Sequence, residues 1–293
     1  MLQIGILGNE GSWYVTQLAA TAASRGHKTT ELRFPQQRAA IVGNQVALHS
    51  GECNIAALDV LIVRTMPPGS LEQVVSRMDF LLQAEALGIR VVNSPRAVEC
   101  AVDKSLTTIK LATAGIPVPD TIVCEDSESA LDAFEKLGGN VVVKPLFGAE
   151  GRGILRIDQP ELALRTFRTL ERIGAVLYVQ RYIEGSGSDI RLLVLAGKVI
   201  AAMKRSPAAG DFRANVSQSG SAEAIEPTDE WCALAIQAAE VTGCDFCGVD
   251  LMLTESDQPL VIEVNAVPGW RAIQRVTGID VAAAFLGWLE GQA

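Results

Sequence analysis

Two apolar runs near the carboxyl end of the chain are separated by a short polar segment. They cover residues 248–253 and 260–265, and residues 255–258 between them read Glu-Ser-Asp-Gln. This pattern predicts a β-hairpin with a longer loop, which fixes two neighbouring antiparallel strands. Because side chains alternate between the two faces of a strand, we expect Glu263 and Asn265 to point the same way.

Asp250 lies on the partner strand, near enough to join Glu263 and Asn265 if the register allows. Burying two carboxylates and an amide oxygen among apolar strands is unfavourable without compensation. A divalent cation supplies it, and oxygen ligands with open water positions suit a Mg²⁺ ion that also holds phosphates. The alternative is three polar side chains on a solvent-facing sheet surface, which the alternation equally permits.

The composition is that of a globular chain without an evident export signal. The 293 residues are 48% hydrophobic and 20% charged, which leaves room for two or three packed units. A formal charge of −9 argues against nucleic-acid or membrane-surface binding as the main activity. The first residues have neither the charged leader nor the apolar length of a signal peptide, so we expect a cytoplasmic protein.

Six cysteines are distributed along the chain. Without an export signal we expect reduced thiols rather than a disulfide framework. Cys244 and Cys247 fit C-x-x-C, but a structural zinc would need two more ligands at a similar spacing, and the sequence has none. We interpret the thiols as small apolar side chains, with redox use as the lesser alternative.

Strands and helices alternate over residues 1–97, which predicts a small α/β unit with a parallel sheet. Its glycines Gly5, Gly8 and Gly11 are spaced G-x-x-G-x-x-G rather than G-x-G-x-x-G. This spacing disfavours a nicotinamide-dependent oxidoreductase, which stays open as an alternative. The expected strands are 3–7, 28–34, 59–64 and 89–93, and the expected helices are 12–24 and 71–87.

The next segment combines a strand-terminal lysine with a glycine-rich turn. An apolar strand over 141–144 ends in Lys144, which must either extend to solvent or meet an anion. Gly148, Gly151 and Gly153 then form a flexible hairpin whose backbone N–H groups can approach phosphates. It is not a Walker A loop, because no Lys-Ser/Thr follows.

Around it we expect helices over 96–114, 128–137 (with Ser127 as N-cap) and 161–173, and strands over 121–124, 154–157 and 177–183.

The carboxyl half is predicted to be mainly hairpins. Strands 189–195 and 198–205 flank the turn Ala196-Gly197. Residues 206–227 have no apolar periodicity and are a functional-loop candidate by length and composition. Helices are expected over 229–241 and 279–290.

Eight segments of the chain share their order with a known family: 103–104, 142–145, 148–153, 179–183, 189–191, 210–215, 248–250 and 263–269. Together they resemble the ATP-grasp ligases, and most closely the RimK-like glutamate (amino acid) ligase family with its tetrahydromethanopterin:glutamate ligase-like branch. The resemblance implies an α/β fold (α+β in the carboxyl half), with a Rossmann-like pre-ATP-grasp domain over 1–97. The two ATP-grasp lobes would then be 98–182, with the glycine-rich lid, and 183–293, with the metal and substrate site.

The same resemblance implies a site for ATP and Mg²⁺. Asp250, Glu263 and Asn265 would hold two Mg²⁺ ions, with Mn²⁺ as a substitute. Arg191 and Arg213 would stabilise acylphosphate or tetrahedral oxyanion charge. ATP would be bound by Lys104, Lys144, Gly148, Gly151, Gly153, Gln180, Arg181, Tyr182, Asp189, Arg213, Ala214 and Asn215.

The implied reaction is amide formation through an acylphosphate. A substrate carboxylate attacks the γ-phosphate, and an incoming amine, expected to be glutamate, displaces phosphate. The acceptor would be a protein tail or a pterin-type coenzyme, and the enzyme a homo-oligomer. Alternatives are a carrier-protein ligase of the lysine or arginine biosynthesis type and a non-catalytic nucleotide-binding regulator. The chain departs from many relatives at Arg181, Ala214 and Gln218, which leaves amino-acid specificity open.

Overall fold

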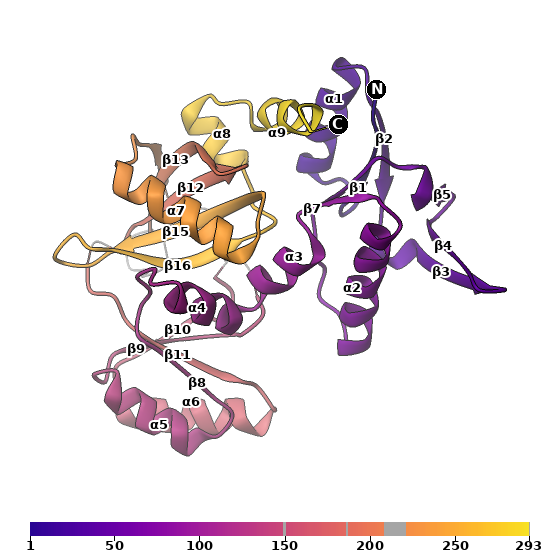
Figure 1. Ribbon diagram of the computed structural model, residues 1–293. Helices are drawn as coiled ribbons and strands as arrows, with labels where there is room; N and C mark the ends of the chain where they lie inside the picture. Colours follow the sequence, from indigo (N-terminus) through magenta and orange to yellow (C-terminus); the bar gives the residue numbers. More distant parts are fainter. Residues whose placement is uncertain (149–150, 186, 208–220, 293) are drawn as a thin grey trace.

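The computed structural model describes residues 1–148, 151–185, 187–207 and 221–292. Within these ranges the chain forms four sheets, with helices packed on three of them (Figure 1). The division into domains at residues 97 and 182 remains a prediction.

The amino-terminal unit is built on a four-stranded sheet of order β2-β1-β6-β7. Every neighbouring pair in it is parallel, which confirms the predicted parallel sheet. The predicted strand 28–34 ends at Leu32, because Phe34–Gln36 turns into a 3-10 helix around Pro35. The elements are β1 (Gln3–Leu7), α1 (Trp13–Ser24), β2 (Lys28–Leu32), β6 (Val60–Val63), α2 (Leu71–Ala86) and β7 (Arg90–Val92).

A small antiparallel sheet, absent from the sequence analysis, projects from this unit. It pairs β3 (Gln37–Val42) with β4 (Gln45–Ser50) and adds the short β5 (Cys53–Asn54). Gly43 and Asn44 form its turn with φ values of 55° and 66°. Positive φ at both central residues is the backbone geometry that two-residue hairpins favour.

The prediction of one helix over 96–114 is wrong. The structure has α3 (Pro95–Val102) and α4 (Lys104–Thr113), separated at Asp103, which is extended with φ −93° and ψ 103°. The Asp103 carboxylate accepts a hydrogen bond from Leu106 N at 3.0 Å and so caps α4. Aspartate favours this capping conformation over a helix interior, which explains the break.

Residues 121–181, called the smaller lobe below, carry an antiparallel sheet of order β10-β9-β11-β8, on which α5 and α6 pack. Asp126 caps α5 by accepting a hydrogen bond from Ser129 N at 2.7 Å. The prediction of Ser127 as the N-cap is therefore wrong, because Ser127 is the first residue of the helix. The elements are β8 (Thr121–Cys124), α5 (Ser127–Lys136), β9 (Val141–Lys144), β10 (Leu155–Ile157), α6 (Pro160–Arg172) and β11 (Leu177–Arg181).

The carboxyl-terminal lobe carries a five-stranded antiparallel sheet of order β14-β13-β12-β15-β16. Both predicted hairpins are present, whereas β14 occupies part of the predicted loop 206–227. The elements are β12 (Asp189–Leu195), β13 (Lys198–Ser206), β14 (Ser221–Ala224), α7 (Asp229–Thr242), β15 (Phe246–Leu253) and β16 (Pro259–Asn265).

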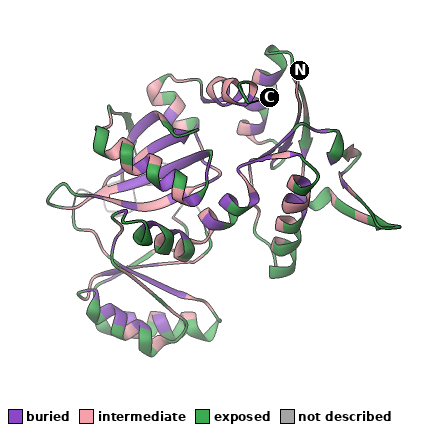
Figure 2. Ribbon diagram, viewed as in Figure 1, coloured by how far each residue is buried: buried purple, intermediate pink, exposed green. Residues whose placement is uncertain are grey.

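The two faces of this sheet have different neighbours. Helix α7 packs on one face, and Figure 2 shows the central strands buried beneath it. On the other face α8 (Arg271–Thr277), which the sequence analysis did not predict, and α9 (Val281–Glu290) join the amino-terminal unit. Trp270 and Phe246 pack in the same core as Ile4 and Leu18 of that unit. The rest of this face is left free for the site.

Two further properties of the described residues concern the cysteines and the helices. All six cysteines are free thiols, as predicted. No helix in the described ranges combines the length and apolar character that crossing a bilayer would require.

Candidate active site

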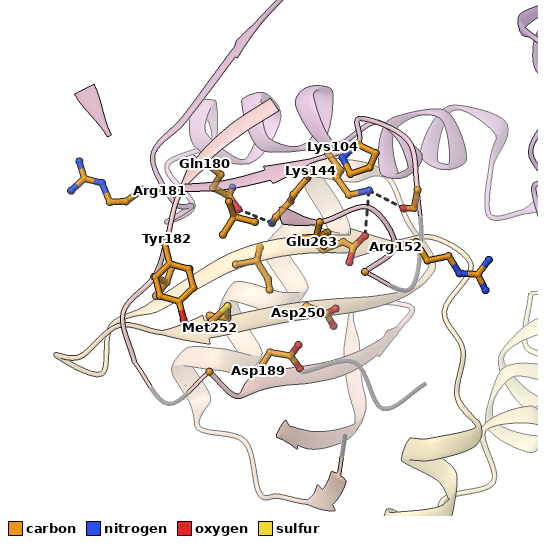
Figure 3. A pocket seen from close by; sticks show the side chains of 18 of the residues that line it. Lys104, Lys144, Arg152, Gln180, Arg181, Tyr182, Asp189, Asp250, Met252 and Glu263 are labelled. Atoms are coloured by element: carbon orange, nitrogen blue, oxygen red, sulfur yellow. Dashed lines mark hydrogen bonds and ion pairs between the residues drawn. The ribbon is translucent and has the colours of Figure 1, made fainter. Parts of the chain in front are cut away.

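A cleft lies between the sheet of the smaller lobe and the free part of the carboxyl-terminal sheet. The space in it, including its open mouth, is roughly 960 Å³. Figure 3 shows side chains from both lobes converging on it. Ten predicted site residues line it: Lys104, Lys144, Gly148, Gly151, Gln180, Arg181, Tyr182, Asp189, Asp250 and Glu263.

Two lysines enter the cleft from one side. Lys104 is the first residue of α4, and its Nζ donates to Gly148 O at 2.8 Å and lies 3.9 Å from Glu263 Oε1. Lys144 ends β9, and its Nζ donates to Gln180 Oε1 at 2.6 Å. Burial lowers the pKa of Lys144 to about 8; Glu263 opposes this shift and Lys104 adds to it.

Lys144 is held by a polar network inside the smaller lobe. Gln180 donates from Nε2 to Thr121 Oγ1 at 2.9 Å and to the Tyr178 hydroxyl at 3.0 Å. That hydroxyl in turn lies 2.8 Å from Thr108 Oγ1 on α4. The amide oxygen of Gln180 is therefore oriented toward Lys144, and the network links the positions of the two lysine-bearing elements.

The described residues of the glycine-rich hairpin line the cleft beside Lys104. Gly151 and Gly153 have φ values of 70° and 75°, a region that glycine adopts readily. A Cβ on Gly153 would lie 2.8 Å from Pro145 Cγ, so the close approach also requires glycine. Arg152 between them lines the cleft and is a residue that the sequence analysis missed.

The end opposite the lysines is more apolar. Tyr182 lines it, and the guanidinium of Arg156 lies 3.6 Å from the centroid of its ring. Arg181 lines the cleft too, but its guanidinium pairs with Asp120 at 3.0 Å and is turned away from the pocket centre (Figure 3). Five apolar side chains also line the cleft: Val142, Ile154, Ile183, Met252 and Ile262.

The acidic side of the cleft depends on a β-bulge in β16. The pairing with β15 shifts at Ile262, which sets Glu263 directly opposite Asp250 and Asn265 opposite Gly248. Opposite residues of an antiparallel pair project to the same face, so the two carboxylates share the cleft side. The predicted alternation of Glu263 and Asn265 fits this register.

A buried ionic network surrounds Asp250. Its Oδ1 accepts from Arg191 Nε at 2.7 Å and its Oδ2 from Arg191 Nη2 at 2.6 Å. Arg205 Nη2 adds a third bond at 2.8 Å and pairs bidentately with Asp189. Burial disfavours the charged form of Asp250, but attraction to Arg191 and Arg205 outweighs it and lowers the pKa of the carboxyl.

Arg205 is a second residue that the sequence analysis missed. It lies opposite Asp189 because one residue bulges from β13, between the pairs Val194–Val199 and Leu193–Ala201. A regular hairpin built on the turn Ala196-Gly197 would instead place Lys204 opposite Asp189. Asp189 was therefore predicted as a site residue, but its partner Arg205 could not be identified from the sequence.

The donor set of the acidic side fits a hard divalent cation. Asp250 and Glu263 supply carboxylate oxygens from opposed positions, and Asn265 Oδ1 accepts from Val267 N at 2.9 Å. Carboxylate and amide oxygens are the ligands that Mg²⁺ prefers. The described residues contain no cluster of three or more His, Cys, Asp or Glu side chains arranged for a metal. A bound ion would therefore depend on further oxygens from phosphates or water.

Three predicted residues, Arg213, Ala214 and Asn215, lie outside the described residues. Three others, Arg191, Gly153 and Asn265, lie beside the cleft rather than on its wall. Arg191 is bonded to Asp250 as described above, and Gly153 packs against Pro145. The proposed roles of all these residues remain predictions.

The chain is similar in sequence to a group of amino-acid ligases. The profile of the RimK-like ATP-grasp domain matches residues 101–289. The tetrahydromethanopterin:α-L-glutamate ligase of Methanosarcina acetivorans is 34% identical over 82% of both chains. A protein of Maridesulfovibrio salexigens named "Probable alpha-L-glutamate ligase" is 33% identical, covering 100% of this chain and 96% of the relative.

Solved structures show the same fold. The ATP-grasp ligase PsnB with its minimal precursor superposes with a TM-score of 0.78 at 22% identity, covering 99% of each chain. A RimK domain ATP-grasp protein of Sphaerobacter thermophilus gives a TM-score of 0.77 at 21% identity and covers 98% of each chain. The opposed lysines and carboxylates thus lie in a cleft of the ATP-grasp fold. The chain belongs to the RimK-like ATP-grasp family, whose members are ATP-dependent ligases.

Proposed function

We propose that this ligase joins the amino group of L-glutamate to a substrate carboxylate. The observation that carries the proposal is the pairing of two lysines with two carboxylates across one cleft. Lys104 and Lys144 face Asp250 and Glu263, with an apolar end beyond them. That arrangement suits a nucleoside triphosphate with its divalent cation, and relatives at 33–34% identity are named α-L-glutamate ligases.

In the proposed reaction the chain positions charged groups rather than supplying a nucleophile. Lys104 and Lys144 would hold the phosphates, and Mg²⁺, for which Mn²⁺ could substitute, would neutralise phosphate charge beside Asp250, Glu263 and Asn265. The substrate carboxylate would take the γ-phosphoryl group, and the amine of glutamate would then displace phosphate to form the amide. Arg191 on β12 is separated from Glu263 on β16 by the strand β15, and it could stabilise the oxyanion if released from Asp250.

The remaining assignments of the site belong to the same proposal. The ribose would lie near Asp189 and the base in the apolar end, near Arg181 and Tyr182. The glycines of the hairpin and the segment 213–215 would complete phosphate binding. Arg213 is proposed as the second arginine acting on the acylphosphate.

For the acceptor we propose a pterin-type coenzyme or a protein tail that ends in a carboxylate. One relative is named for tetrahydromethanopterin and covers 82% of this chain. A carrier-protein acceptor is the alternative within the same reaction class.

The proposal is tested by a screen for ADP release. Purified protein is incubated with ATP, Mg²⁺, glutamate and each carboxylated acceptor in turn, and products are weighed by mass spectrometry. We expect ADP release that requires both substrates and a product heavier by one glutamyl residue. ATP binding without ADP release across the panel would instead indicate a nucleotide-binding regulator.

Glu263→Gln is the matched control for this screen. The amide is isosteric but removes the charge opposite Asp250. We expect loss of Mg²⁺-dependent ADP release with an unchanged circular dichroism spectrum and melting temperature. Turnover at the wild-type rate would contradict the metal assignment.

A further inference from the structure

Two side chains of the amino-terminal unit reach the segment that follows the acidic strand β16. Arg64, directly after β6, donates from Nη2 to Pro268 O at 2.6 Å. Asn93, directly after β7, donates from Nδ2 to Ala266 O at 2.6 Å. Asn93 also donates to Phe246 O and accepts from Phe246 N, which ties the start of β15 to the same point.

Burying the charged side chain of Arg64 is energetically unfavourable, although it holds this segment by one hydrogen bond. Its side chain is buried and lies 4.4 Å from the centroid of the Trp270 ring. Within the described residues no carboxylate pairs with it, and its Nε has no hydrogen-bond partner. Burial lowers the pKa of the guanidinium to about 9, so it remains charged at neutral pH. An apolar side chain of similar length would fill the space without this penalty, so packing alone does not account for arginine.

Segment 266–270, which these residues hold, is hydrogen-bonded to Asn265 and lies close to Arg191. Asn265 Oδ1 is fixed by the N–H of Val267, which lies inside the segment. Pro268 borders Gly248, where a Cβ would lie 3.3 Å from Pro268 and 3.5 Å from Arg191 Nε. A shift of this segment would therefore move the amide oxygen of Asn265 and open the space beside Arg191.

We propose that Arg64 and Asn93 are positioning residues that hold segment 266–270 and thereby set Asn265 and Arg191 for metal-nucleotide binding. The inference rests on the proposed function only in taking Asn265 as a cation ligand. It assigns to the amino-terminal unit a part in the metal side of the site, although no residue of that unit lines the cleft.

The test measures nucleotide binding rather than turnover. ATP affinity is determined by calorimetry in EDTA and across a Mg²⁺ titration for wild type, Arg64→Met and Asn93→Ala. We expect the Mg²⁺ concentration at half-saturation to rise about tenfold in each variant, while affinity in EDTA, set by Lys104 and Lys144, stays within about twofold. A variant that weakens both measurements equally would reveal only a structural role and overturn the proposal.

Arg90→Met is the matched control. Arg90, on β7 of the same sheet, also stacks on a tryptophan, with its guanidinium 4.5 Å from the Trp288 ring centroid. Its ion pair is with Asp245 and, among the described residues, no hydrogen bond joins it to segment 266–270, so its Mg²⁺ half-saturation should match wild type. An effect as large as that of Arg64→Met would show that any loosened contact between these parts suffices, and would contradict the proposal.

A double-mutant cycle separates positioning from general loosening. If Arg64 acts through Asn265, Arg64→Met should add little to the Mg²⁺ defect of Asn265→Ala, whereas additive effects would overturn the proposal. Should Arg64→Met fail to fold, Arg64→Lys carries the test, with a rise of at least threefold expected. A wild-type protein that binds Mg²⁺-ATP but transfers no glutamate would contradict the proposed function. The Mg²⁺ dependence of ATP binding in the variants could still be compared, because it does not require turnover.

Discussion

The ammonium group of Lys144 loses its proton more readily than an ordinary lysine does, because its pKa is lowered. Its pKa of about 8 results mainly from burial, and phosphate binding requires the protonated form. Below pH 8 the free protein already carries this proton, and above pH 8 it must take one up to bind ATP. We therefore expect the ATP dissociation constant to rise as pH increases from 8 to 9.5, by up to about tenfold per pH unit. Calorimetry at several pH values measures this.

Two variants check that Lys144 is the source. Lys144→Ala should weaken ATP binding at pH 7 by about 10- to 100-fold, as expected for a charge-assisted hydrogen bond, and remove the pH dependence. Lys144→Arg should keep affinity but lose the rise above pH 8, because arginine stays protonated. The same alkaline rise in Lys144→Ala would assign it to another group.

Arg205 is expected to be the most costly charge to remove from the sheet. It bonds to Asp189 and Asp250, and all three side chains are buried. Arg205→Met leaves Asp189 without its partner, so we expect a loss of about 3–5 kcal/mol in the free energy of unfolding. Urea denaturation measures it. The neighbouring Lys204→Met, on the opposite face of β13, should stay within about 0.5 kcal/mol. Adding Asp189→Asn should recover part of the Arg205→Met loss; no recovery would mean that the pair does not dominate.

At the scale of elements, the break between α3 and α4 places Lys104 at a helix start. Asp103 caps α4, so Asp103→Ala should lower the free energy of unfolding by about 1 kcal/mol and let Lys104 shift, weakening ATP binding. Asp126→Ala removes the equivalent cap of α5, away from the cleft. It should cause a similar loss of stability with unchanged ATP affinity. Equal ATP defects in both variants would show that the cap affects only stability.

The sequence located most elements but not their register. The hairpins at 189–205 and 248–265 were predicted because apolar alternation and turn residues are local signals. The bulges at Ile200 and Ile262 have no such signal, since an extra residue is stabilised only by packing of the finished sheet. Asp103 did carry a local signal, because aspartate inside an expected helix is a candidate cap.

At the scale of the molecule, the contact between α9 and the amino-terminal unit is partly electrostatic. Glu290 accepts hydrogen bonds from Arg25 and lies 2.7 Å from His27 Nε2. These bonds, first Arg25 and then His27, lower the pKa of Glu290 to about 2. Its contribution to stability is therefore present above the ordinary glutamate pKa and disappears as pH falls toward 2.

We expect Glu290→Gln to lower the melting temperature at pH 7 by about 1–3 °C, a small value because the pair is partly exposed. The difference from wild type should shrink between pH 4.5 and pH 2, which scanning calorimetry can follow. Glu10→Gln, which removes an exposed pair with Arg33, should shift melting by less. A constant difference down to pH 2 would mean that the charge of Glu290 is not responsible.

The layout of the whole molecule was only partly accessible from the sequence. The parallel sheet followed from alternating strands and helices, and the cleft residues followed from resemblance to a known family. The sheet β3-β4-β5 and helix α8 were missed because their segments are short and carry little apolar periodicity. Segment 266–270 lies between the two parts of the chain, and its partners Arg64 and Asn93 are about 170–205 residues away in sequence.

The bulge at Ile262 has a consequence for what the cleft can distinguish. Consecutive side chains of a regular strand project to opposite faces of the sheet, so an apolar and an acidic neighbour cannot both face the same cleft. Here Ile262 and Glu263 both line the cleft. In the proposed function, Ile262 would support the uncharged ring of the nucleotide and Glu263, the next residue, would anchor the charge at its tail. Deleting Ile262 should leave the acid in place and remove that support, so that ATP and bare tripolyphosphate would bind more nearly alike.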